Sequence, residues 1–123
     1  MKELTKAEEQ VMQVLWDLDG GFVNEVIEQL PEPKPAYNTV STIIRILEKK
    51  GFVGFEAFGR AHRYHPIVEK DDYRQFSMGR MINNYFQGSF SEMVSFFVKE
   101  NNLSLGEIAE LKKMIENSKN KKS

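Results

Sequence analysis

The sequence predicts a mainly α-helical protein with one small β-hairpin, arranged as a winged helix-turn-helix domain followed by a helical arm. Apolar residues recur with helical spacing before residue 50 and again after residue 69. Between these regions, a stretch rich in valine and phenylalanine is interrupted at residues 58–61, which is typical of two strands joined by a tight turn. We expect the winged-helix domain over residues 1–68, the arm over residues 69–118 and a disordered tail over residues 119–123.

The first two helices are predicted from the signals at their ends. Thr5 and Glu8 have the spacing of a capping box, so a helix should begin here. Asp19-Gly20-Gly21 should end it, because glycine readily adopts the left-handed conformation that closes many helices. A short helix is expected over residues 24–30, and the three prolines between residues 31 and 35 cannot continue it. The buried stripe of the first helix should comprise Ala7, Val11, Val14, Leu15 and Leu18.

The third helix carries the strongest functional signal. Four apolar residues recur at i, i+3, i+4 and i+7 and predict a buried face, and the helix should stop at Gly51. The opposite face is polar. Its hydroxyl and amide groups could reach DNA bases, and its cations could neutralise phosphates. We expect the DNA contacts of this helix to come from Asn38, Thr39, Ser41, Thr42, Arg45 and Lys49, and the buried face from Val40, Ile43, Ile44 and Leu47.

The hairpin is expected to pair residues 52–58 with residues 61–67 and to present a basic tip. Arg60 and Arg63 are predicted to bind DNA phosphates. His62 and His65 are expected to point to the same face of the second strand. They could bind a metal, sense pH or serve as plain surface residues of the hairpin.

The arm contains more apolar surface than three short helices are expected to bury alone. Five of the nine phenylalanines lie after residue 69. Two explanations are open: the arm pairs with a second copy of the chain, or it folds back on the winged-helix domain. The pairing residues predicted for a homodimer are Phe86, Phe90, Met93, Val94, Phe97, Leu105 and Ile108.

Composition restricts the function further. The formal net charge is −1, but residues 34–65 hold six cations against two acids, whereas residues 1–32 hold two cations against eight acids. The basic character is therefore local to the proposed DNA-binding surface. Without cysteine, a metal triad, a phosphate loop or a nucleophile with its base, the sequence predicts no enzyme, no metal and no cofactor. Trp16 could stack on a base or pack in the core. With neither a signal peptide nor an apolar run that could span a bilayer, we expect a cytoplasmic protein that does not insert in the membrane.

Five segments, in order, resemble the penicillinase-repressor family (BlaI/MecI type) over roughly residues 4–116. They are residues 4–16, Thr39-Val40-Ser41-Thr42 with residues 47–51, Gly59-Arg60-Ala61 with Tyr64 and Pro66, Gly88-Ser89, and Leu103-Ser104.

The resemblance implies a dimeric winged-helix repressor that binds a palindromic operator on double-stranded DNA and blocks transcription. In the best-known branch of the family, a membrane-bound sensor protease responds to β-lactam and cuts the repressor in its penultimate helix. The bond cut there is typically Asn-Phe, and the matching positions in this chain are Phe96 and Phe97, our candidate proteolytic site. The family also commonly has an arginine where this chain has Ile46, and the arginine of this chain is Arg45, one place earlier. One step along a helix turns a side chain by about 100°, so the phosphate contact and the preferred operator should differ from those of the family.

The function predicted from the sequence is thus a dimeric, sequence-specific repressor. Two other classes stay open. One is a winged-helix adaptor that binds another protein and does not bind DNA; salt distinguishes it from a repressor, because DNA binding weakens steeply as the salt concentration rises. The other is an enzyme fragment or a sensor of a small ligand, which a ligand that raises the melting temperature would favour.

Overall fold

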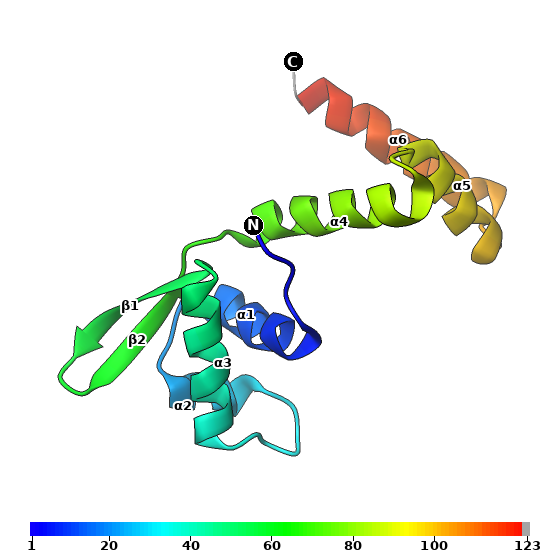
Figure 1. Cartoon of the computed structure of the whole chain (residues 1–123). Coiled ribbons are helices and arrows are strands. Elements are labelled where there is room, and N and C mark those ends of the chain that lie inside the picture. The colour runs from blue at the N-terminus through cyan, green and yellow to red at the C-terminus, as the bar shows by residue number, and fades with distance from the viewer. Residues whose placement is uncertain (122–123) are drawn as a thin grey trace. The chain divides into compact units, whose positions relative to one another are not determined.

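The computed structural model describes residues 1–121, and it describes side chains to residue 117. The chain divides into two compact units, Met1–Ser77 and Met78–Ser123, with the division inside one helix. Figure 1 shows the order of the elements. They are α1 (Lys6–Leu18), α2 (Val23–Gln29), α3 (Tyr37–Lys49), β1 (Val53–Phe58), β2 (Ala61–Pro66), α4 (Lys70–Phe86), α5 (Phe90–Glu100) and α6 (Leu105–Lys121). The predicted fold class, mainly helical with one antiparallel hairpin, is confirmed.

The start and end of α1 follow from the predicted signals. The Thr5 hydroxyl accepts a hydrogen bond from the backbone of Glu8, and the Glu8 carboxylate accepts one from the backbone of Thr5, which completes the capping box. At the other end Asp19 itself takes the left-handed conformation with φ 55°, and Gly20 follows with φ 106°. The chain can therefore turn sharply between α1 and α2.

The core of the first unit lies between α1, α2, α3 and the base of the hairpin. Ala7 and Leu18, predicted in the buried stripe of α1, are exposed, whereas Met12 is fully buried. Because α1 contacts α2, α3 and β2, its buried surface is wider than a single i, i+3, i+4 stripe and includes Met12. Ala7 and Leu18 lie in the first and last turns of α1. The largest fully buried side chains are Phe52, Met12, Leu15, Ile44, Leu47, Val11, Val26, Val40 and Val53.

The hairpin is attached to the helices by the turn after α1. Gly21 and Tyr64 exchange two backbone hydrogen bonds of 2.8 and 2.9 Å, so the turn pairs with β2. A Cβ at Gly20 would lie 2.8 Å from both the Tyr64 carbonyl and the Arg63 guanidinium. Only glycine allows this close approach together with its positive φ.

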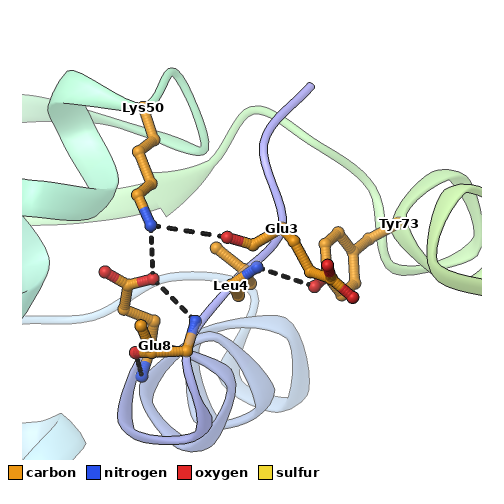
Figure 2. A network of polar contacts seen from close by, with 6 residues as sticks. Glu3, Leu4, Glu8, Lys50 and Tyr73 are labelled. Carbon is orange, nitrogen blue, oxygen red and sulfur yellow. Dashed lines mark hydrogen bonds and ion pairs between the residues drawn. The ribbon is translucent and has the colours of Figure 1, made fainter. Parts of the chain in front are cut away.

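A buried ion pair joins the end of α3 to the start of α1 (Figure 2). Lys50 Nζ lies 2.6 Å from a Glu8 carboxylate oxygen, and the Glu8 side chain is only 6% exposed. Lys50 also donates to the carbonyl of Glu3, at 3.5 Å. The residue after the third helix is thus held by the N-terminal segment.

The first turns of α4 belong to the first unit. The backbone of Leu4 donates to the buried Tyr73 hydroxyl, as Figure 2 shows, and the Tyr73 ring packs edge-on against Phe52. Trp16 donates its indole N–H to the Val68 carbonyl and packs against the core, so its predicted core role is confirmed. These contacts explain why the structure divides at Ser77, nine residues beyond the domain end placed at residue 68 from sequence.

The second unit comprises the rest of α4 with α5 and α6. None of the side chains of α5 is buried. α6 runs to Lys121, so its backbone includes residues 119–121 of the predicted disordered tail, and residues 122–123 lie outside the described residues. In the part of the chain that the structure describes, no helix has the length and apolar character to cross a membrane.

We expect Lys50→Met to lower the free energy of unfolding at neutral pH by about 1 to 3 kcal/mol, because it leaves the buried Glu8 carboxylate without its cation. Burial raises the pKa of Glu8, but the hydrogen bonds from Lys50 and Thr5 outweigh it, so the net pKa is lowered from 4.5. A lowered pKa means that the pair stabilises the wild type above pH 4.5 and that this contribution is lost as the pH falls further.

Urea unfolding at neutral pH and at acidic pH measures both effects. The matched control is Lys49→Met, because Lys49 is the exposed neighbouring lysine. Equal stability of the two variants, or an unaltered acid dependence in Lys50→Met, would contradict the role given to the ion pair.

Candidate nucleic-acid interface

The outer face of α3 presents most of the side chains predicted to bind DNA. Asn38, Thr39, Thr42, Arg45 and Lys49 are all exposed. The Thr42 hydroxyl donates a 2.8 Å hydrogen bond to the Asn38 carbonyl one turn earlier, so its lone pairs remain as acceptors on this face. The face combines amide, hydroxyl and cationic groups on one rigid element.

Ser41 is the exception on α3. The sequence placed it on the exposed polar face, but its side chain is buried, with the residue 8% exposed. It follows Val40 by one position, at the border of the buried face. Its small hydroxyl lines a groove together with residues of α2 and of the hairpin and does not belong to the outer surface of α3.

A groove of about 560 Å³ lies between α3 and the hairpin. It is built within the first unit, and its lining residues come from the start of α2, from α3, and from the tip and second strand of the hairpin, elements that Figure 1 labels. Of the predicted DNA-binding residues, the groove brings together Ser41, Arg45 and Arg60. Its complete lining is Phe22, Val23, Asn24, Tyr37, Ser41, Arg45, Arg60, Ala61, His62 and Tyr64.

Three polar groove residues, Asn24, Tyr37 and His62, were not among the predicted contacts. Tyr37 could have been suspected, because it is the first residue of α3 and half exposed, and a tyrosine there offers a hydroxyl to a ligand. Asn24 and His62 come from other elements, and no spacing rule within one helix points to them.

Two of the cations near the interface bind the protein itself. Lys50 is paired with Glu8, and Arg63 donates from its guanidinium to the Asp19 carbonyl at 3.2 Å. Arg63 thereby closes the end of α1, and its exposure is intermediate. Arg60, at the hairpin tip, is exposed and lines the groove.

The two histidines lie on opposite faces of the hairpin, so the prediction that they share a face is wrong. Residues three apart on a strand point in opposite directions. His62 stacks on Phe55, whereas the His65 ring lies over Gly54. Among the residues that the structure describes, no three histidine, aspartate or glutamate side chains are grouped to hold a metal ion.

Tyr64 forms the buried inner end of the groove. Burial raises the pKa of the Tyr64 phenol, and the charge of Glu48 raises it further, against the opposing effect of Arg45. The hydroxyl is therefore neutral at physiological pH and able to donate a hydrogen bond into the groove.

The second unit contains an apolar groove of about 430 Å³ between its helices. Five of the seven predicted pairing residues line it, together with Phe96, whereas Leu105 and Ile108 of α6 lie outside the lining. Leu105 is 87% exposed. Three lining residues from α4 and α6, namely Met78, Met81 and Leu111, were not among the predicted pairing residues. The complete lining is Met78, Met81, Phe86, Phe90, Met93, Val94, Phe96, Phe97 and Leu111.

Comparisons with known proteins agree with this geometry. A family model described as penicillinase repressor matches residues 4–117. The methicillin resistance regulatory protein MecI of Staphylococcus aureus (strain N315) is 31% identical over 114 residues, which cover 92% of this chain and 93% of that protein. The penicillinase repressor of Bacillus licheniformis is 31% identical over 121 residues, covering 98% of this chain and 94% of that protein.

The chain is also similar to a solved structure. The solution structure of the DNA-binding domain of the repressor BlaI is 32% identical and superimposes with a TM-score of 0.51, covering 59% of this chain and 94% of that one. Because the family model spans nearly the whole chain and the curated relatives match end to end, this chain belongs to the penicillinase repressor family, a family of transcriptional repressors and not of enzymes.

Proposed function

We propose that this chain is a dimeric repressor that binds a palindromic operator in the cytoplasm through the outer face of α3 and the hairpin. The observation that carries the proposal is the exposed set of Asn38, Arg45 and Lys49 on one helix beside the basic groove. Asparagine and arginine can each make paired hydrogen bonds to a base edge, and lysine can neutralise a phosphate. The BlaI structure described as a DNA-binding domain supports this use of the first unit.

A second copy of the chain is the proposed occupant of the apolar groove in the second unit. Phe90 and Phe97 are both more than half exposed, although phenylalanine at such density is rarely left in water. Two copies would cover both grooves by the same contacts, as expected for a twofold dimer. Two DNA-binding units on a twofold axis fit an operator with inverted half-sites one or two helical turns apart.

The proposal is tested by selecting fragments of genomic DNA with the purified protein at moderate salt and sequencing them. Enrichment of a short inverted repeat is the expected result. A folded protein that enriches no DNA, or binds with no salt dependence, would favour the adaptor function that the sequence leaves open.

Arg45→Ala should remove most of the preference for the selected operator over a scrambled duplex, because one base contact contributes about 1 to 3 kcal/mol of discrimination. Lys49→Ala should weaken both duplexes equally, because a phosphate contact is independent of sequence. Fluorescence anisotropy with both duplexes measures the two effects. Lys112→Ala on α6 is the control, and an Arg45→Ala variant with undiminished discrimination would contradict the assignment.

Phe97→Asp should dissociate the dimer at concentrations where the wild type is paired. Burying one phenylalanine contributes about 1.5 to 3 kcal/mol, and a charge in the interface adds a further cost. Sedimentation equilibrium measures the change. Ser95→Asp places the same charge at an exposed position of α5 that does not line the groove, so it should remain dimeric. A dimeric Phe97→Asp protein would locate the interface elsewhere.

We further propose that a membrane-bound sensor protease relieves repression by cutting between Phe96 and Phe97. Both side chains are exposed, but the bond lies within α5, so cleavage requires local unfolding of that helix. The cut would separate Phe97 and Leu111 from the other seven lining residues of the groove. Mass spectrometry of the protein from cells treated with β-lactam should then detect a fragment that ends at Phe96, whereas only intact chain would contradict cleavage.

A further inference from the structure

The groove between α3 and the hairpin differs in chemistry from the outer face of α3. Its lining combines two guanidinium groups, from Arg45 and Arg60, with neutral hydrogen-bonding side chains. Among the described residues that line it there is no carboxylate. A site with donors and positive charge but no acid is suited to an anion.

His62 is held in this groove by an aromatic stack. Its ring lies 4.3 Å from that of Phe55 at an interplanar angle of 12°, and its edge meets Tyr64 at 6.1 Å and 64°. The register of the hairpin explains the stack, because Phe55 pairs with Tyr64 and Ala57 with His62, so all four share one face.

Phe55 is 42% exposed, so it contributes less burial than the core residues do. The Phe55 ring stacks on the imidazole of His62, and this contact restricts the rotation of an exposed side chain. A group fixed in place before binding costs less entropy when a ligand arrives.

We propose that the groove receives the backbone of one DNA strand beside the base contacts of α3, with His62 as a phosphate-binding residue and Phe55 as the residue that positions it. This inference rests on the proposed DNA-binding function and deepens it. A phosphodiester is the anion that a helix in the major groove brings next to the hairpin. A phosphate near an imidazole favours its protonated, charged form, so binding is coupled to proton uptake.

The other charged or titratable groups around His62 are few. Tyr37 and Arg45 face the groove from α3, and Arg60 and Tyr64 face it from the hairpin. Glu48 lies close enough to act on the Tyr64 phenol. Arginine and tyrosine keep their protonation states between about pH 5.5 and 7.5, and an ordinary carboxylate stays ionised there. Histidine is the residue type in this lining that commonly acts as a pH-dependent switch, so a pH-dependent contribution of the groove to DNA binding would be assigned to His62.

The test measures the affinity for the selected operator duplex as a function of salt at about pH 5.5 and pH 7.5. Each phosphate neutralised by the protein adds about −0.9 to the slope of log K against log salt. We expect the wild-type slope to be steeper at the lower pH by up to this amount per protomer, which is about −1.8 for the proposed dimer. His62→Gln should abolish the difference between the two pH values.

His65→Gln is the matched control, because the chain has only two histidines and His65 lies on the other face of the hairpin. It should keep the wild-type pH difference, and melting temperatures should show that all variants fold alike. Phe55→Leu should reduce the difference and Phe55→Tyr should retain it, because only the latter preserves the stack.

The proposed DNA-binding function and the proposed role of His62 can be contradicted separately. Wild-type protein that binds no duplex would overturn the proposed function itself. Wild-type protein that binds operator, with the same pH difference in His62→Gln as in wild type, would overturn only the role of His62. A pH difference lost in His65→Gln instead would place the titrating phosphate contact on the opposite face of the hairpin.

Discussion

The backbone pairing between Gly21 and Tyr64 is the contact on which the interface depends. It fixes β2 against the turn that follows α1, and the same turn leads directly into α2. The groove has α3 on one side and β2 on the other, so its width is determined by how closely the hairpin approaches the helices. That approach is possible because Gly20 has no side chain, and Arg63 and the Tyr64 carbonyl occupy the space a Cβ would need.

Local patterns predicted the elements well but could not predict how surfaces from different elements combine. The apolar spacing of α3 and the capping box at Thr5 are contained within one helix, and the structure confirms both. The burial of Ser41 depends on the elements that pack around α3, and the pairing of Lys50 depends on Glu8, 42 residues earlier in the chain. Contacts between residues that are far apart in the chain produce no periodic pattern in the sequence. The groove residues Asn24, Tyr37 and His62 were missed for the same reason.

The two units bury their apolar residues to different extents, in agreement with the separate functions proposed for them. In the first unit Tyr73 closes the core by contacting the N-terminal segment and Phe52, so the start of α4 is fixed to the winged helix. In the second unit the phenylalanines of α5 remain exposed and line an open groove. A unit that completes its core with its own residues is suited to the rigid DNA-binding surface proposed for it, whereas the exposed apolar groove of the second unit fits the proposed pairing with a second copy.

The distribution of ion pairs limits how DNA can be bound. Of the six cations between residues 34 and 65, Lys50 pairs with Glu8, Arg63 binds the Asp19 carbonyl, and Lys34 donates to the carbonyls that end α2. In the described part of the chain, the exposed cations without such contacts on this surface are Arg45, Lys49 and Arg60. With Arg45 assigned to a base contact, Lys49 and Arg60 give two phosphate contacts per protomer and a salt slope of only about −2. In a protein of net charge −1, the further charge proposed for His62 would add about half as much again to this slope, and the proposed base contacts and the proposed pairing of two copies would supply the rest of the affinity.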